Sequence, residues 1–253
     1  MPTILDVSHV TKTFRERSRQ TVRAVDDISL TVEAGECVGI VGESGSGKST
    51  LAHMITRLIL PDSGSITLCG TELTTIQGAA LRAAYRNVKM IFQEPRSSFD
   101  PRLTLGQSLN EALKPVLPKR SQRMAEAKSL FEKVGLDAHF LNLCPAQVSG
   151  GECQRAAIAR AIAQKPRLLI CDEATSALDV SVQAQIIGLL HEIRRESRLS
   201  LLFISHDLAL VSSFCDRIYV LHDGKVVEQG ATDQILHTPS QPYTKRLVNA
   251  ARI

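Results

Sequence analysis

The feature that most constrains the fold is a glycine-rich segment between an apolar run and a helical pattern. Residues 37–41 read Cys-Val-Gly-Ile-Val, residues 42–50 read Gly-Glu-Ser-Gly-Ser-Gly-Lys-Ser-Thr, and apolar residues then recur at helical spacing as far as Ile59. A strand, this loop and a helix in that order match the phosphate-loop pattern G-x-x-x-x-G-K-[ST]. Its glycines turn backbone N–H groups toward phosphates, Lys48 reaches the β- and γ-phosphates, and Ser49 ligates Mg²⁺. A merely flexible Gly/Ser loop is the alternative. It would not account for Lys48 or for the strand before the loop and the helix after it, so the phosphate loop is favoured.

Two acidic residues follow a second apolar run. Residues 168–171 read Leu-Leu-Ile-Cys, and Asp172 and Glu173 come directly after them. A buried parallel strand delivers such carboxylates to the carboxyl edge of its sheet. We expect Asp172 to hold Mg²⁺ and Glu173 to orient, or take a proton from, the water that attacks a γ-phosphate. An acidic strand end in solvent is the alternative, which the upstream loop disfavours.

The order of patterns along the chain predicts an α/β fold with a helical insert. Apolar and polar residues alternate over 4–10 and 22–32, which predicts an N-terminal antiparallel β-layer. Asp223-Gly224 joins two strand patterns and predicts a hairpin. Prolines punctuate helical segments from 95 to 165. We therefore expect one domain over 1–253, with a nucleotide-binding core at 1–94 and 166–253 and a helical subdomain at 95–165.

Composition excludes several classes of protein. The 253 residues are 43% hydrophobic, yet no apolar stretch reaches the roughly 18–20 residues of a membrane span. Asp6 and His9 interrupt the N-terminal apolar run, so no secretory leader is expected. The net charge of +4 is interspersed and does not indicate nucleic-acid binding. The six cysteines are scattered without metal or disulfide spacing, so we expect reduced thiols that mostly serve packing.

A second anion-binding helix start connects these motifs to a known family. Residues 148–155 read Val-Ser-Gly-Gly-Glu-Cys-Gln-Arg and open a strongly helical run. The segment resembles the signature motif of the ATP-binding cassette (ABC) family. The order of motifs over residues 4–245 also resembles that family: the phosphate loop, Gln93 after a strand, the signature, Asp172-Glu173, the segment 176–179 and His206 after another strand. The resemblance implies a P-loop NTPase fold of the ABC type, a RecA-like core with an antiparallel β-layer and a helical subdomain.

The resemblance also implies roles for single residues. Phe14 would stack on adenine, although a core residue of the β-layer is the alternative. Gln93 would touch Mg²⁺ and the attacking water, and His206 would contact the γ-phosphate and hold Glu173. The catalytic residues are therefore Glu173, His206 and Gln93, and the metal ligands are Ser49, Gln93 and Asp172. ATP would be bound by Phe14, Gly42, Glu43, Ser44, Gly45, Ser46, Gly47, Lys48, Ser49 and Thr50, with Ser149, Gly150, Gly151 and Asp179 completing the site.

The signature implies a partner subunit. Ser149, Gly150 and Gly151 would bind the γ-phosphate of ATP on a partner's phosphate loop, and Asp179 would bridge to that opposite subunit. The active unit is thus expected to be a head-to-tail dimer with two shared sites. The family's commonest pattern has Gln at the position of Glu152. A carboxylate near a phosphate is unfavourable, but it can point away, so we do not expect activity to be lost.

Further stretches resemble one subfamily, the ATPases of peptide and nickel importers. They are residues 93–102, 181–185 and the Pro-Tyr-Thr segment within 238–247. The chain ends ten residues after Tyr243 with no cysteine beyond Cys215, which favours the nickel-type members. Nickel, a nickel chelate and di- or oligopeptides all stay open as cargo.

The subfamily resemblance implies partners and a location. We expect two permease subunits, a second identical or paralogous ATPase and, indirectly, a substrate-binding protein, with no nucleic acid. The chain would lie peripherally on the cytoplasmic face of a bacterial inner membrane. The alternatives are the ATPase of another ABC transporter and a soluble ABC ATPase without a transport role. One cassette without long insertions and the Pro-Tyr-Thr segment argue against both.

Overall fold

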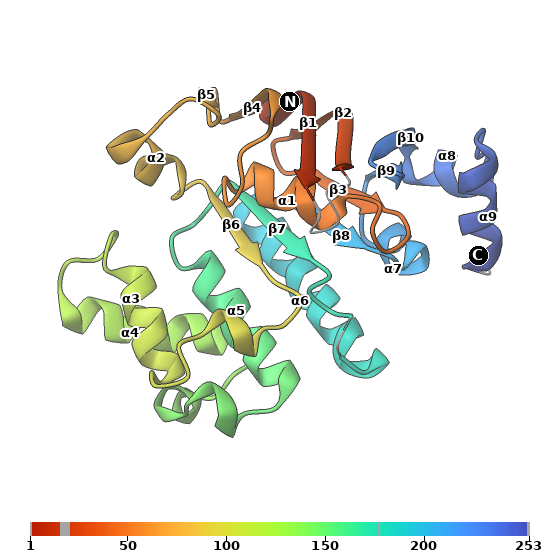
Figure 1. Cartoon of the computed structure of the whole chain (residues 1–253). Coiled ribbons are helices and arrows are strands. Elements are labelled where there is room, and N and C mark those ends of the chain that lie inside the picture. The colour runs from red at the N-terminus through yellow and green to blue at the C-terminus, as the bar shows by residue number, and fades with distance from the viewer. Residues whose placement is uncertain (1, 16–20, 177, 252–253) are drawn as a thin grey trace.

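A computed structural model describes residues 2–15, 21–176 and 178–251 and contains two β-sheets (Figure 1). The smaller sheet has the order β2-β1-β4-β5, with every neighbouring pair antiparallel. Its strands are β1 (Thr3–Arg15), β2 (Thr21–Glu33), β4 (Ser63–Leu68) and β5 (Thr71–Glu72). Val7 lies between Leu30 and Ile66 on the two neighbouring strands, so apolar side chains line one face. The predicted N-terminal antiparallel layer is confirmed.

The larger sheet has the order β10-β9-β3-β8-β7-β6 and is parallel except at β10. Asp223 (φ 47°) and Gly224 (φ 75°) turn β9 into β10, since both adopt the left-handed backbone that a tight hairpin requires. The predicted hairpin is therefore present. The strands are β3 (Cys37–Val41), β6 (Val88–Ile91), β7 (Leu168–Asp172), β8 (Ser200–Ser205), β9 (Arg217–His222) and β10 (Lys225–Ala231).

Both faces of the parallel sheet are buried, which explains its continuous apolar runs. Ile40, Ile170 and Ile204 belong to one core cluster with helix α1 (Lys48–Ile55) and the antiparallel sheet. Their neighbours along the strands belong to a second cluster with the helices of the opposite face. The helices of that face include α6 (Val180–Ser197) and α7 (Leu208–Ser212). The parallel strands are thus fixed from both sides, and so is the edge at which they end.

Between β6 and β7 the chain forms only helices, which gather at the lower left of Figure 1. Thr104 starts α3 with a capping box, and Phe131 on α4 is fully buried in the second cluster. The helices are η1 (Arg96–Ser98), α3 (Leu105–Leu113), α4 (Arg120–Lys133), η2 (Ala138–Asn142), η3 (Pro145–Gln147) and α5 (Gly150–Ile162). The division of the domain at 94/95 and 165/166 stays a prediction.

One helix boundary differs from the sequence expectation. Helix α1 ends at Ile55 and does not continue to Ile59, because Arg57 adopts a left-handed backbone (φ 57°). Leu58 is consequently 58% exposed. Met124 on α4 is 50% exposed and does not join the buried face of that helix. The remaining helices are α2 (Gly78–Ala84), α8 (Thr232–His237) and α9 (Pro242–Ala250).

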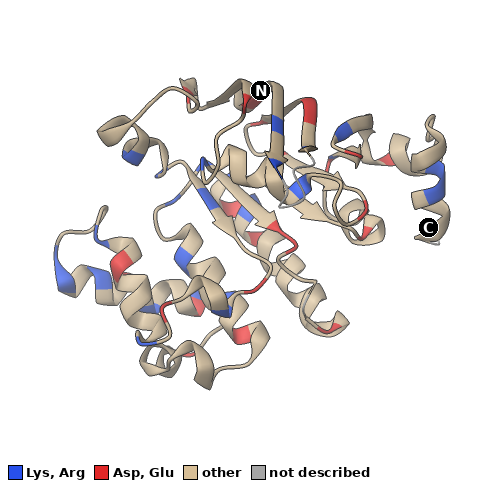
Figure 2. Cartoon of the chain, viewed as in Figure 1, with Lys and Arg blue, Asp and Glu red and all other residues tan. Residues whose placement is uncertain are grey.

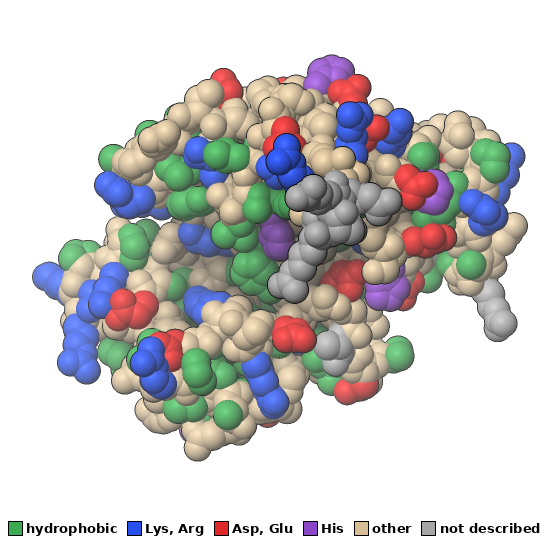
Figure 3. Space-filling model, in the orientation of Figure 1, with side chains coloured by type: hydrophobic (Ala, Val, Ile, Leu, Met, Phe, Trp, Pro, Cys, Tyr) green, Lys and Arg blue, Asp and Glu red, His purple; other side chains and the backbone are tan. Residues whose placement is uncertain are grey.

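In the described residues, neither the surface charges nor the cysteines point to a particular ligand or partner. None of the described helices combines the length and the apolar character needed to cross a bilayer. Charged residues of both signs are spread over all layers (Figure 2), and the face in Figure 3 is hollowed between the helical segment and the two sheets. All six cysteines are free thiols, and four of them are buried. The remaining two are Cys69, which is exposed, and Cys144.

Candidate functional site

The register of the parallel strands brings four separated segments to one edge. Val41 pairs with Ser205, Asp172 with Ile204 and Ile91 with Cys171. The residues that follow these strands therefore emerge side by side at their carboxyl ends. In open α/β sheets this edge is where ligands bind. Gly42, Gln93, Glu173 and His206 are among the residues delivered there.

The phosphate loop, residues 42–47, is shaped by close approaches that only glycine allows. A Cβ atom on Gly42 would lie 2.2 Å from the carbonyl oxygen of Leu221, and one on Gly47 would lie 2.2 Å from that of Ala24. Gly47 also has φ 99° at the residue that precedes α1. Helix α1 thus begins directly at the loop, and its first N–H groups have no helical acceptors. The loop and helix together form an anion-binding site.

Lys48 is buried and folded back onto this loop. Its Nζ donates hydrogen bonds to the carbonyl oxygens of Gly42 (2.8 Å) and Glu43 (2.7 Å). Burial lowers the pKa of Lys48, while the carboxylates of Asp172 and Glu173 act in the opposite direction. A phosphate placed in the loop offers this ammonium group charged acceptors in exchange for the two neutral carbonyls.

Ser49 and Asp172 form the pair expected to hold a divalent cation. The Ser49 hydroxyl donates a 3.1 Å hydrogen bond to Oδ1 of Asp172, whose residue is 6% exposed. Burial raises the pKa of Asp172, and the Ser49 hydrogen bond opposes that rise. A hydroxyl and a carboxylate oxygen beside a phosphate loop fit the hard oxygen ligands that Mg²⁺ prefers. Within the described residues no cluster of three or more His, Cys, Asp and Glu side chains is arranged for a metal.

Glu173 is the centre of a second group of polar side chains. Gln93 Nε2 donates a 3.0 Å hydrogen bond to Glu173 Oε2, and His206 Nδ1 lies 3.5 Å from Glu173 Oε1. Glu173 has a left-handed backbone (φ 47°), a conformation that costs about 1–3 kcal/mol for such a residue and is concentrated at functional sites. The structure therefore brings together all three residues predicted to be catalytic. Ser176, which contacts Gln93 at 3.3 Å, joins them without having been predicted for this group.

Two adjoining cavities open at this edge. One has a volume of about 270 Å³ and is lined by the phosphate loop, Gln93 and Glu173. The other has about 470 Å³ and is lined by the start of the loop, Glu173, His206 and Leu247. Ser44 and Glu173 border both cavities, so the two cavities are neighbours. Their combined walls carry the Lys48 cation, two carboxylates, several hydroxyls and the Gln93 amide, which suits a polyphosphate and an attacking water.

The signature residues lie elsewhere in the chain. Ser149, Gly150 and Gly151 border neither cavity. Ser149 caps α5: its hydroxyl accepts the N–H of Glu152 at 3.3 Å, and the Glu152 carboxylate accepts the N–H of Ser149 at 2.7 Å. This capping box holds the Glu152 carboxylate at the start of α5, so in this structure the carboxylate does not take the orientation away from the helix start that was open to it.

Asp179 and Phe14 also lie outside the cavities. Asp179 is the N-cap of α6, where its side chain accepts the N–H of Val182 at 3.0 Å. Ala177 of the same motif lies outside the described residues. Phe14 on β1 is 40% exposed, with Lys12 Nζ 5.8 Å from its ring centroid, so the alternative of a core residue is wrong. Its contact with adenine stays a prediction.

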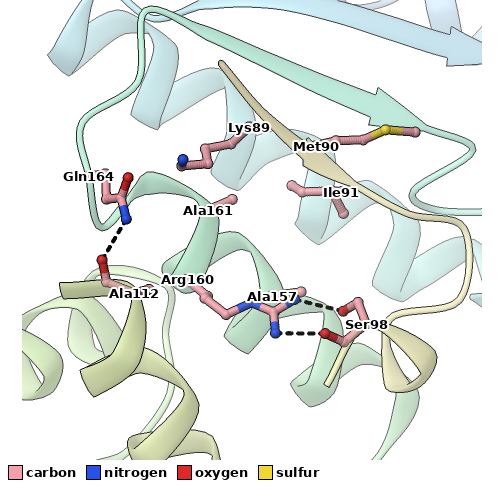
Figure 4. A pocket seen from close by; sticks show the side chains of 9 residues that line it. All are labelled: Lys89, Met90, Ile91, Ser98, Ala112, Ala157, Arg160, Ala161 and Gln164. Atoms are coloured by element: carbon pink, nitrogen blue, oxygen red, sulfur yellow. Dashed lines mark hydrogen bonds between the residues drawn. The ribbon is translucent and has the colours of Figure 1, made fainter. Parts of the chain in front are cut away.

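The segment after Gln93 contacts the signature helix α5 through two arginines, and no local pattern in the sequence predicts these contacts. Figure 4 shows Arg160 reaching from α5 to Ser98, where it donates to the carbonyl oxygen and the hydroxyl, both at 2.8 Å. Its guanidinium also lies 4.0 Å from the Phe99 ring centroid. Arg96 donates to the carbonyl oxygen of Val148 at 2.6 Å. The segment after Gln93 is thus tied to both ends of the signature helix, beside a cavity of about 220 Å³.

Comparison with known proteins places this arrangement in a family. The profile of the ABC transporter family matches residues 25–176. The chain is 44% identical to the oligopeptide transport ATP-binding protein OppF of Escherichia coli strain K12 over 236 residues, which are 92% of this chain and 71% of that protein. It is 47% identical to the probable peptide ABC transporter ATP-binding protein y4tS of Sinorhizobium fredii, over 92% of this chain and 66% of that protein.

A solved structure agrees in fold. The dimeric post-hydrolysis state of the ATP-binding cassette MJ0796, bound to ADP and phosphate, matches with a TM-score of 0.82 and 29% identity, over 90% of this chain and 99% of that one. The matched profile covers more than half of the chain, including the phosphate loop, the signature and the Asp172-Glu173 strand end. By its motifs, their convergence at one sheet edge and these similarities, the chain belongs to the ABC transporter family.

Proposed function

We propose that the chain is the ATP-hydrolysing subunit of an importer for peptides. The observation that carries the proposal is the convergence of Lys48, Ser49 and Glu173 on adjoining cavities at the carboxyl edge of the parallel sheet. Asp172 lies directly behind this lining, where it accepts the hydrogen bond of the Ser49 hydroxyl. The family supports ATP as the nucleotide, and the similar proteins named above support peptides as the cargo.

In this proposal the loop holds the triphosphate. The N–H groups at the start of α1 and the Lys48 ammonium neutralise the phosphate charge. Ser49, Asp172 and Gln93 would hold Mg²⁺, which supplies further neutralisation of the phosphates when bound. Phe14 would offer its exposed ring to the adenine.

Glu173 would act on water. Its carboxylate is held by Gln93 on one oxygen and faces His206 on the other, which fixes its direction. It would accept a proton from the water whose oxygen bonds to the γ-phosphorus, while the bond from that phosphorus to the β,γ-bridging oxygen breaks. The products are ADP and phosphate. His206 would contact the γ-phosphate from the neighbouring strand.

A second subunit would complete the site. Ser149, Gly150 and Gly151 border neither cavity of their own chain, and the similar cassette MJ0796 forms a dimer. In a head-to-tail pair each signature would close on the ATP of the partner's loop. Asp179, at the start of α6, would bridge the two subunits.

An importer needs further partners besides the second ATPase subunit. Two permease subunits would carry the cargo across the inner membrane, with a substrate-binding protein outside and this chain peripheral on the cytoplasmic face. The hydrogen bonds of Arg96 and Arg160 would transmit permease movement between the helical segment and Gln93. Both similar proteins named above are peptide-transport ATP-binding proteins, so nickel, which the sequence pattern alone favoured, is an outcome to be tested.

The test is reconstitution of the chain with its permeases and binding protein in lipid vesicles. We expect short peptides to raise the ATPase rate and to accumulate inside. In the same vesicles, Glu173→Gln should lower hydrolysis by about 100-fold or more, the effect expected when a general base is removed. Glu192→Gln, on the exposed side of α6, is the matched control and should keep the wild-type rate.

The outcomes separate the parts of the proposal. Stimulation by Ni²⁺ or a nickel chelate without stimulation by peptides would reject the cargo and leave the ATPase standing. Near-wild-type turnover in Glu173→Gln would remove Glu173 from its role. Co-purification with ribosomes or DNA and with no membrane protein would reject the importer.

A further inference from the structure

The C-terminal helix α9 touches the phosphate loop. The backbone N–H of Glu43 donates a 3.1 Å hydrogen bond to the hydroxyl of Tyr243, 200 residues further along the chain. Tyr243 is 6% exposed, and Leu247, one turn later, borders the cavity next to the loop. The contact therefore lies at the edge of the proposed ATP site and involves a side chain held in place by burial.

Tyr243 is fixed from several sides. Its ring stacks on that of His222, with centroids 4.0 Å apart and planes 20° from parallel. The start of α9 is anchored by Glu228 on β10, whose carboxylate accepts the N–H of Ser240 at 2.7 Å and that of Gln241 at 3.1 Å. The hydroxyl is thus presented to the loop by a hairpin and a helix that are themselves tied together.

The first half of the loop has few other anchors. Glu43, Ser44 and Gly45 are exposed, and a Cβ on Gly45 would meet no atom within 4 Å. The carbonyl oxygens of Gly42 and Glu43 are held by Lys48 Nζ, and that of Glu43 also accepts the N–H of Ser46 at 3.2 Å within the loop. A phosphate that attracts the ammonium group takes the two Lys48 hydrogen bonds away. The Tyr243 hydrogen bond does not involve Lys48 and persists.

This difference gives Tyr243 a role in binding. We propose that Tyr243 is a positioning residue for ATP, which holds the loop at Glu43 in its phosphate-binding shape once Lys48 has moved to the phosphates. The inference rests on the proposed function, because it needs ATP in the loop. Since the hydrogen bond matters more in the bound state than in the free state, its loss weakens affinity and not only stability.

The experiment measures the ATP dissociation constant and steady-state hydrolysis of the full chain with Tyr243→Phe. This variant removes the hydroxyl and keeps the ring on His222. We expect the dissociation constant and KM for ATP to rise about two- to tenfold, the effect of one net hydrogen bond, with kcat within twofold of wild type.

Tyr219→Phe is the matched control. It also removes a buried hydroxyl that accepts hydrogen bonds, here from the Thr31 N–H at 3.2 Å and from Arg217 at 2.9 Å, none of which is part of the loop. We expect a comparable loss of thermal stability and unchanged ATP affinity. If Tyr243→Phe and Tyr219→Phe bind ATP equally well, or if Tyr243→Phe lowers kcat with KM unchanged, the proposal is overturned. A wild-type chain that binds no ATP would instead overturn the proposed function.

Discussion

The buried carboxylate of Asp172 lowers the stability of the fold and is proposed to serve metal binding. Asp172 is buried beside a hydroxyl and is not neutralised by any salt bridge in the described part of the chain. Burial raises its pKa above that of an exposed aspartate, which is about 3.9. The ionised form therefore costs folding free energy that Mg²⁺ would recover on binding.

We predict that Asp172→Asn makes the nucleotide-free chain more stable. Removing the buried charge at neutral pH should raise the free energy of unfolding by about 0.5–2 kcal/mol, which is typical of substitutions that relieve a functional strain. Because the pKa of Asp172 is raised in the folded state, the difference in unfolding free energy between the variant and the wild type is complete above that folded-state pKa. It shrinks as pH falls through the folded-state pKa and vanishes below the pKa of the unfolded chain. Thermal unfolding at pH 7.5 and near pH 4 measures it.

The same variant should bind ATP with little response to Mg²⁺, as measured by calorimetric titration with and without the ion. Asp233→Asn is the control, since Asp233 is exposed in the first turn of α8 and should leave both properties nearly unchanged. A lower melting temperature for Asp172→Asn at pH 7.5 would show that the carboxylate is not a burden to the fold.

At the scale of the element, the start of α5 combines a helix cap with an anion site. The Glu152 carboxylate and the Ser149 hydroxyl satisfy each other's backbone N–H groups. The carboxylate stabilises the helix through the helix dipole, yet it lies where the partner's γ-phosphate is proposed to bind. Glutamine closes the same capping box without a charge.

We therefore predict that Glu152→Gln strengthens ATP-dependent association of two subunits. A like-charge repulsion of about 1 kcal/mol, the value for two unit charges a few ångströms apart in water, corresponds to roughly a fivefold lower ATP concentration at half-maximal dimer. Sedimentation over a range of ATP concentrations measures it. Glu152→Ala, which loses the carboxylate half of the capping box, should lower the melting temperature. Unchanged or weaker association in Glu152→Gln would place the carboxylate away from the phosphate.

Elements encoded by local patterns were predictable. The period-two alternation over residues 4–10 gave β1, and Asp223-Gly224 gave the β9–β10 hairpin, because both depend on neighbours in sequence. The meeting of Gln93, Glu173 and His206 was implied by the resemblance to the ABC family, and parallel strands that end at one edge account for it physically.

The features that could not be predicted depend on distant partners. Helix α1 ends early at Ile55, before the left-handed Arg57, whose guanidinium donates to the carbonyl oxygen of Ile76. Arg160 meets Ser98 across 62 positions, and Tyr243 meets Glu43 across 200. Nothing in the local pattern of either side chain specifies such a contact, since packing alone selects which residues of the two elements face each other.

At the scale of the whole molecule, Gly150 and Gly151 differ in what they contact. Gly151 is needed for packing within one subunit, and Gly150 is proposed to contact the nucleotide of the partner subunit. A Cβ on Gly151 would lie 2.7 Å from Cγ1 of Val182 on α6, so this glycine is required where α5 meets α6. A Cβ on Gly150 would lie 3.5 Å from Leu178, an ordinary contact. Only Gly150 can therefore be given a side chain without disturbing its own subunit.

We predict opposite effects of the two alanine substitutions in the Glu173→Gln background, in which ATP is retained. Gly150→Ala should keep or raise the melting temperature, because alanine favours a helix over glycine by about 1 kcal/mol in the interior and by less at the first residue, where Gly150 lies. It should nevertheless abolish the ATP-dependent dimer by placing a methyl group against the partner's phosphate. Gly151→Ala should lower the melting temperature of the monomer itself. Sedimentation with ATP and Mg²⁺, together with thermal unfolding without them, distinguishes the two. If Gly150→Ala dimerises as well as its parent, the signature does not close on a partner's nucleotide and the head-to-tail arrangement is wrong.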